Sequence, residues 1–192
     1  LFDLRTPTNF FKSVYFNHVG NHNLSNALCA ITIADQVGLN MEIALKSLSS
    51  FSGVSRRMQI YSFESNFIID DYAHHPTEIK FVFETIQSNY SNKENCVIFQ
   101  PHLFSRTKFL INEFANELSR FDNIYLLDIY PAREKKIKGV SSKLLLSKIK
   151  NSSKELIKKN QIKDIIINSK EKVFALLGAG DIGLEINKLL YQ

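Results

Sequence analysis

The sequence predicts an α/β protein whose larger domain holds a Rossmann-like, mainly parallel sheet with one antiparallel edge strand. From Met58 onward, short apolar runs typical of buried strands alternate with amphipathic helical patterns, which is the order of βαβ units. The first two runs, Gln59–Phe63 and Phe67–Asp70, are separated by only three residues. Such a short connection allows only a hairpin, so one strand at the edge of the sheet should be antiparallel.

The stretch before this domain predicts strand and turn followed by two helices. Residues 1–19 alternate loosely between apolar and polar side chains. We expect a first helix after Gly20, capped by Asn21 or Asn23 and ended by Gly38. A second helix is expected over Met41–Ser50, with its apolar residues directed inward: Ile43, Ala44, Leu45 and Leu48.

The remaining elements follow from apolar runs and helical periodicity. Further strands are predicted at Cys96–Phe99, Ile124–Leu127, Asp164–Ile167 and Val173–Leu177. Helices are predicted at Thr77–Ser88, Thr107–Arg120, Ser142–Lys150, near Lys154–Lys159, and at Ile182–Leu190. The composition changes from helical to strand-like at the Arg56-Arg57 pair, so we predict two domains, 1–57 and 58–192.

Composition and charge exclude several classes of function. The chain is 44% hydrophobic and 22% charged, as in a soluble globular protein, and no apolar run reaches the ~20 residues of a membrane helix. The net charge is +5, but the lysines lie on amphipathic stretches without interleaved aromatic residues, which favours solvated helix faces over a nucleic-acid surface. We expect neither nucleic acid nor membrane as a partner. The two cysteines, Cys29 and Cys96, predict buried thiols rather than a disulfide framework.

The sequence FIIDDYAHHPT, Phe67 to Thr77, holds the densest group of polar side chains. An apolar strand ends at two carboxylates, Asp70 and Asp71, and a tyrosine, two histidines and a proline come before the next helix. Ligands of open α/β sheets collect beyond the carboxyl ends of the strands. The plainer alternative is a polar loop in which Pro76 begins the helix.

Later strand ends add further polar groups. Gln100, His102 and Arg106 follow one strand, and Asp128 and Tyr130 follow the next. The carboxyl ends of parallel strands meet at one edge of a sheet, so these loops should converge. Their convergence predicts a ligand-binding site.

Two other motifs are weaker. Gly178 to Gly183 matches G-x-G-x-x-G after a strand, but no acidic residue lies about 20 positions further on to hold a ribose. We therefore expect a tight strand-to-helix turn rather than a dinucleotide site. His74 and His75 are neighbours that tend to point apart, and no cysteine pair supports them, so a metal held by histidines is not expected.

Three stretches together resemble one family. DDYAHHPTEI from Asp70, GNHNLSNALCAI from Gly20 and FQPHLFSRTK from Phe99 are similar to, and in the same order as, motifs of the Mur ligases. These are ATP-dependent ligases that build the peptide of peptidoglycan through an acyl phosphate. The last stretch resembles the alanine-adding branch. The resemblance implies ATP, Mg²⁺, UDP-N-acetylmuramate and L-alanine as cofactors and partners, and a cytoplasmic location.

The resemblance also implies roles for individual residues. The groups that would bind ATP are Asn23 and Asn26 near adenine, Arg57 at the phosphates, and Asp71 and Tyr72 at the ribose. His74, His102 and Arg106 would face the reacting centre and the carboxylate of the amino acid, as catalytic and amino-acid-binding groups. No metal ligand is assigned.

The chain departs from the family pattern in two ways. Leu103 stands where the alanine-adding branch usually has an arginine, and no G-x-x-x-x-G-K-[ST] motif occurs. The chain also opens at Leu1 without the features of a domain start, so we expect it to be part of a longer polypeptide and inactive alone. On this expectation, residues 1–57 are the helical tail of a P-loop ATPase domain. A recycling ligase that attaches a peptide to the same sugar, and a non-catalytic binding module, remain alternatives.

Overall fold

The computed structural model describes residues 1–7 and 9–191 and divides into two compact units, Leu1–Val54 and Ser55–Gln192. We treat each unit by itself. The structural division lies close to the predicted boundary at Arg57. The assignment of 1–57 to an ATPase domain and of 58–192 to an amino-acid-binding domain stays a prediction.

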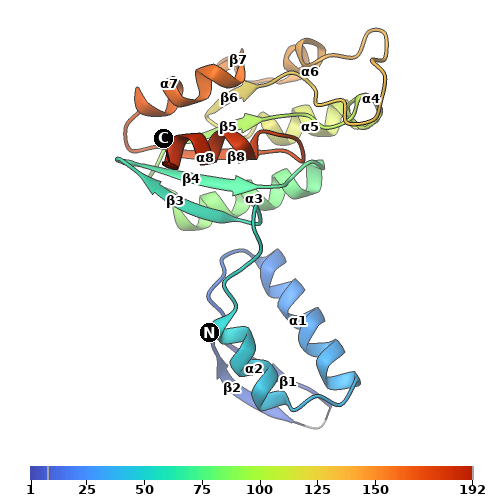
Figure 1. The fold of residues 1–192 in the computed structure, drawn as a ribbon, viewed down its shortest axis with the longest axis vertical. Helices are drawn as coiled ribbons and strands as arrows, with labels where there is room; N and C mark the ends of the chain where they lie inside the picture. Colours follow the sequence, from blue (N-terminus) through green and yellow to red (C-terminus); the bar gives the residue numbers. More distant parts are fainter. Residues whose placement is uncertain (8, 192) are drawn as a thin grey trace. The chain divides into compact units, whose positions relative to one another are not determined.

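The first unit is a small hairpin covered by two helices (Figure 1). Its elements are β1 (Phe2–Arg5), β2 (Phe10–Val14), α1 (Asn21–Gln36) and α2 (Met41–Ser50). The two strands pair antiparallel. Leu4, Val14, Ile31 and Met41 are buried together, one from each element, and form the core of this unit.

The ends of α1 and α2 differ in how they are capped. The N-cap of α1 is Gly20, whose φ of 95° is easy only for glycine, and no side chain caps the helix. The prediction of Asn21 or Asn23 as the cap was therefore wrong; the Nδ2 amide of Asn23 donates instead to the Val19 carbonyl at 2.8 Å. Helix α2 begins as predicted, and the Asn40 side chain accepts from two amides of its first turn.

Two predictions of burial in this unit were also wrong. Ile43 is 65% exposed, whereas Ala44, Leu45 and Leu48 do pack against the core. Helix α2 is only ten residues long and covers the unit with one narrow face, so a residue one position away points outward. Cys29 is exposed on α1, and only Cys96 is a buried thiol.

The second unit holds a six-stranded sheet with the order β3-β4-β8-β5-β6-β7. Its strands are β3 (Gln59–Phe63), β4 (Asn66–Asp71), β5 (Asn95–Phe99), β6 (Asn123–Leu126), β7 (Lys154–Leu156) and β8 (Val173–Leu177). The edge strand β3 is antiparallel to β4, and the other neighbours are parallel. The predicted fold class, including the antiparallel edge strand, is confirmed.

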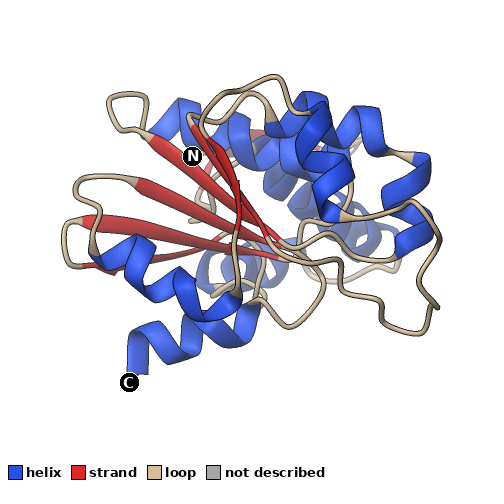
Figure 2. Cartoon of the chain, turned by 90° about the horizontal axis from the view of Figure 1, so that it is seen from above, coloured by secondary structure: helices blue, strands red, loops and turns tan. Residues whose placement is uncertain are grey.

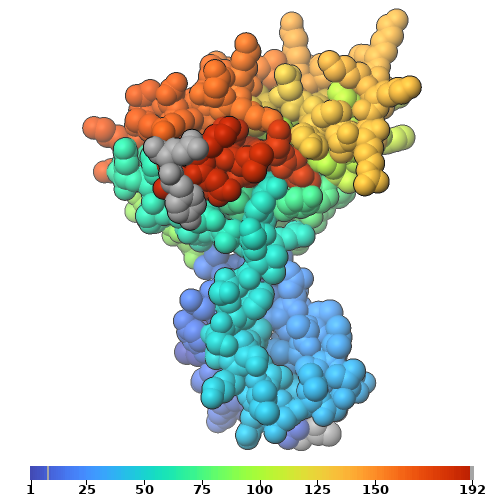
Figure 3. All heavy atoms as spheres, in the orientation of Figure 1, coloured from blue at the N-terminus to red at the C-terminus, as the bar shows by residue number. Residues whose placement is uncertain are grey.

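Helices cover both faces of this sheet. They are α3 (Pro76–Asn89), α4 (Phe104–Phe109), α5 (Ile111–Leu118), α6 (Ser142–Lys148), the 3₁₀ helix η1 (Lys159–Gln161), α7 (Ile162–Ile167) and α8 (Gly183–Tyr191). The C-terminal helix lies on one face of the twisted strands (Figure 2). The space-filling view shows the orange segment with α7 next to the red segment with α8 at the surface (Figure 3).

Strand alternation divides the core between the two faces. Ile68, Ile98 and Leu176 belong to the cluster that contains the buried residues of α7 and α8. The next residue along each strand points the other way, where the Phe99 ring packs 5.4 Å from the Phe114 ring of α5. All five residues of β5 and all five of β8 are buried, as expected for central parallel strands.

Two elements were predicted with the wrong type. The predicted strand Asp164–Ile167 is helix α7, in which Ile162 and Ile166 are buried one turn apart. The predicted helix near Lys154–Lys159 is strand β7 followed by η1. Strand β7 occupies the free edge of β6, and this pairing, between residues about 30 positions apart, overrides local propensity.

The predicted helix Thr107–Arg120 begins earlier and is broken at Leu110 into α4 and α5. Leu103 precedes α4 with a φ of 72°, in the left-handed region that non-glycine residues rarely adopt. Among the residues described, no helix is both long and apolar enough to cross a membrane.

Candidate functional site

The loops after β4, β5, β6 and β8 leave the sheet at one edge. Asp71 of β4 lies beside Leu177 of β8, which lies beside Phe99 of β5, which lies beside Leu126 of β6. The strands therefore end in register, and their loops emerge together. The predicted convergence of strand-end loops is present in the structure.

Asp71 shapes the loop after β4. The residue is only 5% exposed. Its two carboxylate oxygens accept from the Met58 and Ala73 amides, each at 2.8 Å. The bond to Ala73 turns the chain immediately after the strand, in the manner of an Asx-turn. The turn directs Tyr72 and His74 out of the sheet edge.

Helix α3 begins with a capping box that also holds His74. The His75 ring accepts from the Thr77 amide, Pro76 occupies the first turn, and the Glu78 carboxylate accepts from the amides of His74 at 2.7 Å and His75 at 3.0 Å. The first turn of α3 therefore fixes the backbone of both histidines. Glu78 was not among the predicted site residues, although an acid three residues after the cap is a recognisable signal.

Four rings form a row along this edge. The Tyr72 and His74 ring centroids are 5.5 Å apart, those of His74 and His102 are 6.0 Å apart, and those of His102 and Tyr130 are 5.7 Å apart with nearly parallel planes. The loops after β5 and β6 are joined beneath the row, because the Leu103 amide donates to the Tyr130 carbonyl at 3.0 Å. Two residues predicted for catalysis, His74 and His102, are therefore neighbours.

Arg106 completes the group. Its Nη1 atom lies 3.3 Å from Nδ1 of His102, one helical turn away. Burial, the Arg106 charge and the nearby His74 lower the pKa of His102, so this imidazole resists protonation. His74, His102 and Arg106, the three residues predicted to face the reacting centre, thus form one cluster.

A carboxylate anchors the start of α4. Glu134, in the loop after β6, accepts from the Ser105 amide at 2.9 Å and from the Ser105 hydroxyl. These hydrogen bonds from Ser105 hold the pKa of Glu134 below its usual value. Glu134 was missed at the sequence level, because it lies 29 residues from its partner and no local pattern links them.

The adjacent arginines Arg56 and Arg57 have different environments. Arg56 donates from Nε to Asp70 at 3.4 Å, from Nη1 to the Gly180 carbonyl at 3.1 Å, and from Nη2 to the Gly178 carbonyl. Arg57 is exposed, and its guanidinium lies 5.8 Å from the centre of the Tyr72 ring. Arg56 is thus a structural clamp, whereas Arg57 is accessible to a ligand at the Tyr72 end of the row.

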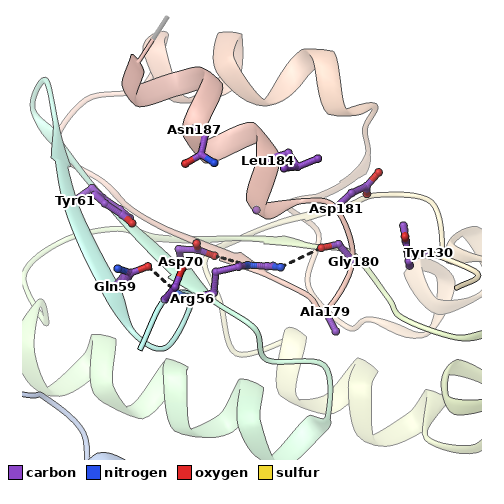
Figure 4. Close-up of a pocket in the computed structure, with 12 residues that line it drawn as sticks. Arg56, Gln59, Tyr61, Asp70, Tyr130, Ala179, Gly180, Asp181, Leu184 and Asn187 are labelled. Atoms are coloured by element: carbon purple, nitrogen blue, oxygen red, sulfur yellow. Dashed lines mark hydrogen bonds and ion pairs between the residues drawn. The ribbon is translucent and has the colours of Figure 1, made fainter. Parts of the chain in front are cut away.

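A pocket of about 360 Å³ opens on the α8 side of the sheet (Figure 4). It is lined by Arg56, residues of β3, Asp70, the turn after β8 and the first turns of α8, together with Tyr130 of the ring row. The Arg56 guanidinium also lies 5.0 Å from the centre of the Tyr72 ring, at the other end of that row. Burial raises the pKa of Asp70 to about 6, although Arg56 opposes this shift. None of the residues to which the family resemblance assigns a role lines this pocket, although Asp70 and Tyr130, two of the predicted strand-end polar groups, do.

The glycine motif Gly178–Gly183 forms the tight turn between β8 and α8. Its carbonyls accept from Arg56, and the Ile182 amide donates to the Gln100 side chain at 3.1 Å. A Cβ on Gly180 would lie 2.9 Å from Cβ of Tyr130, an atom fixed by the backbone, so the turn favours glycine there. An acidic residue, Asp70, does lie near this turn, at the end of the neighbouring strand β4, although it is more than 100 residues away in the sequence. The Arg56 side chain already packs on the turn.

The predicted ATP-binding residues fall in both units. Tyr72, Arg57 and Asp71 lie at the edge just described. Asn23 and Asn26 lie on α1 in the first unit, and their role at adenine stays a prediction. Among the described residues no group of three or more His, Cys, Asp or Glu side chains could hold a metal ion, and Asp70 and Asp71 are already engaged.

The sheet topology defines an α/β domain of Rossmann-like topology, with a cluster of imidazoles and a guanidinium group at the ends of its strands. Residues 56–182 match the family described as Mur ligase, glutamate ligase domain. The chain belongs to the Mur ligase family.

Several relatives have the same name. The chain is 46% identical over 190 residues to a UDP-N-acetylmuramate–L-alanine ligase of Christiangramia forsetii, and 47% identical over 184 residues to one of Flavobacterium psychrophilum. These alignments cover 98% and 95% of this chain but 42% and 41% of the relatives. The chain thus spans about two fifths of the length of these curated relatives.

Two solved structures share the fold of this chain. The UDP-N-acetylmuramate-alanine ligase of Thermotoga maritima superposes with a TM-score of 0.74 at 28% identity, covering 91% of this chain and 38% of that chain. MurF from Acinetobacter baumannii has a TM-score of 0.70 at 16% identity, covering 99% of this chain and 42% of that chain, which shows a shared fold.

Proposed function

We propose that the polypeptide carrying this chain joins L-alanine to UDP-N-acetylmuramate with ATP, through an acyl phosphate, in peptidoglycan synthesis. The observation that carries the proposal is the cluster of His74, His102 and Arg106 at the strand-end edge. The names of the relatives support the choice of substrates. The reaction would take place in the cytoplasm.

The cluster suits the second half of such a reaction. An acyl phosphate and an amino-acid carboxylate are both anionic, and fixed donors in a partly desolvated site stabilise both more than water does. Arg106 would bind the carboxylate of L-alanine as a planar fork, while the two imidazoles face the reacting carbonyl. Leu103 stands where the alanine-adding branch usually has a second arginine, so Arg106 would bind the carboxylate without a guanidinium from position 103.

ATP would be held at the other end of the ring row. The exposed Arg57 would meet its phosphates, Tyr72 would lie at the ribose with Asp71, and Asn23 and Asn26 would lie near adenine. Most ligands of Mg²⁺ would lie outside this chain, as the family resemblance implies. We also propose that residues 1–57 belong to the ATPase domain and 58–192 to the amino-acid-binding domain.

The test is phosphate release by the complete gene product that contains this chain. With UDP-N-acetylmuramate, L-alanine and ATP together, we expect release that stops when either acceptor substrate is left out. The same assay with the 192-residue chain should give none, because the sequence has no P-loop. Release with an alanyl peptide in place of L-alanine would favour the recycling ligase. No release by the complete product, with nucleotide binding retained, would favour a binding module.

A further inference from the structure

The hydrogen bonds of His74 determine which of its ring nitrogens carries the proton. Nδ1 of His74 lies 3.0 Å from the carbonyl oxygen of Tyr72. A carbonyl only accepts hydrogen bonds, so Nδ1 must be the donor. In the neutral ring the lone pair is therefore on Nε2, and His74 presents a proton acceptor at its outer end.

His102 has the opposite arrangement. Its Nδ1 lies 3.3 Å from Nη1 of Arg106. A guanidinium only donates, so Nδ1 of His102 must carry the lone pair, and the proton of the neutral ring is on Nε2. Stacking on Tyr130, at 5.7 Å between ring centroids, fixes the plane of the ring. His102 therefore presents an N–H donor at its outer end.

We propose that the two neighbouring histidines have different chemical roles: His74 is the base that accepts a proton from an incoming ammonium group, and His102 is a neutral hydrogen-bond donor to an oxygen of the acyl group. Arg106 has a second role as the positioning residue that fixes the tautomer of His102. This inference rests on the proposed function for the identity of the amine and the acyl phosphate.

The groups around each ring suit these roles. The Glu78 carboxylate lies 3.4 Å from Nδ1 of His74 and would stabilise the imidazolium that forms when His74 accepts a proton. His102 faces Arg106 from α4 and His74 from the loop after β4, both of which oppose a positive charge on it. Glu134 from the loop after β6 acts in the other direction, and the net result is the lowered pKa of His102.

The proposed step conserves atoms and charge. One N–H bond of the ammonium group breaks, its electron pair stays on the nitrogen, and the proton forms a new bond to Nε2 of His74. The free amine then attacks the carbonyl carbon of the acyl phosphate. A C–N bond forms, the bond between the carbonyl carbon and the bridging oxygen breaks, and its electron pair leaves on the phosphate. The second N–H proton of the attacking nitrogen passes to the departing phosphate, so the products are a neutral amide and hydrogen phosphate. Throughout, His102 keeps its proton and donates a hydrogen bond to the carbonyl oxygen.

The tautomers can be measured on the 192-residue chain without any ligand. We would record nitrogen-15 spectra of histidine-labelled protein from pH 5 to 8 and assign them with His74→Gln and His102→Gln. We expect the Nδ1–H tautomer for neutral His74 and the Nε2–H tautomer for His102, with His102 neutral at pH 7. The same tautomer at both residues, or a protonated His102 at pH 7, would overturn the proposal.

A pair of variants tests the role of Arg106 in the same experiment. Arg106→Met removes the donor, so the His102 tautomer should become mixed and its pKa should rise. Lys108→Met removes an exposed positive charge from the same helix and should leave the His102 tautomer unchanged. Equal effects of the two variants would mean that Arg106 acts only through its charge, and the positioning role would be lost.

Kinetics of the complete ligase separate donor from base. Glutamine places an amide N–H near the position of Nε2 but cannot accept a proton at pH 7, so His102→Gln should keep kcat within about fivefold, whereas His102→Ala should lose about a hundredfold or more. His74→Gln should lower kcat by about 10²–10⁴-fold, with a small change in KM for L-alanine. If His102→Gln is as inactive as His102→Ala, the donor role is wrong. If the wild type releases no phosphate, the proposed function fails while the tautomer measurement still stands.

Discussion

Arg56 and Asp70 form an ion pair, 3.4 Å from Nε to Oδ1, at the point where the β3–β4 hairpin meets the turn before α8. The Asp70 side chain is 6% exposed and that of Arg56 is 22% exposed. The same guanidinium donates to the carbonyls of Gly178 and Gly180, more than 120 residues along the chain. The Arg56 side chain thus links the β3–β4 hairpin to the turn that leads into the C-terminal helix.

Replacing Arg56 should lower the free energy of unfolding much more than replacing its neighbour Arg57. Arg56→Met leaves a buried carboxylate and two carbonyls without their donor, so we expect a loss of unfolding free energy of about 2–4 kcal/mol. Arg57→Met should change it by less than about 0.5 kcal/mol, because Arg57 is exposed. Urea denaturation of both variants measures this difference. Similar losses in the two would contradict the assignment of Arg56 as the clamp.

Asp70 should make stability depend on pH in the acidic range. Its pKa is about 6 in the folded chain against 3.8 as the ordinary value, because burial disfavours its charge. Between about pH 4 and 6 the folded state holds this proton more tightly than the unfolded state, so the unfolding free energy falls as the pH rises. The titration of Asp70 lowers the unfolding free energy by no more than about 3 kcal/mol over this range.

Asp70→Asn removes this titration and is the variant to compare with the wild type. Urea denaturation at pH 4.5, 5.5 and 6.5 should give a flatter profile for the variant. Asp164→Asn, at an exposed position of α7, should keep the wild-type slope. A variant slope equal to that of the wild type would mean that Asp70 does not titrate in this range.

Arg106→Ala in the complete ligase should mainly raise the KM for L-alanine. Arg106 is the guanidinium of the histidine cluster, and removing a charged hydrogen-bond donor to a carboxylate costs about 1.5–3 kcal/mol, or roughly ten- to a hundredfold. Steady-state kinetics with L-alanine varied provides the measurement, and Lys108→Ala is the matched control. An unchanged KM would remove Arg106 from the amino-acid site.

Asp71→Ala should weaken the binding of ATP more than the binding of L-alanine. Asp71 lies at the Tyr72 end of the ring row and is expected at the ribose. The substitution should also destabilise the domain by about 1–3 kcal/mol, since the buried Met58 amide loses its acceptor. Kinetics at a temperature well below unfolding separates the two effects. Equal increases in KM for both substrates would contradict a role at the nucleotide.

The two thiols should differ in reactivity. Burial raises the pKa of Cys96 to about 12, so at pH 8 it holds almost no thiolate, whereas Cys29 is exposed. Ellman's reagent should therefore label one thiol in the native chain and two in denaturant. Cys29→Ser should abolish native labelling; labelling that persists in this variant would show that Cys96 is accessible.

Much of the fold could be predicted from local patterns. The bounds of β3 and β8 agree with the predicted runs, because both strands are apolar or alternating between clear breaks. Prediction failed at Lys154–Leu156, a short polar segment that becomes a strand only because β6 offers it an open edge. It failed again at Asp164–Ile167, where consecutive β-branched residues favoured a strand although the buried positions follow a helical period.

The sequence by itself determined the α/β class, the antiparallel hairpin and the chemical types gathered at the strand ends, since these depend on periodicity and on residues close together in the chain. Only the tertiary structure decided which of Arg56 and Arg57 is a clamp, because the carbonyls that Arg56 contacts come from the far end of the chain. Only the tertiary structure also decided the row of rings, because His74, His102 and Tyr130 come from three different loops. Parallel strands bring loops together that the chain keeps far apart, so the site is determined by the order of the strands in the sheet.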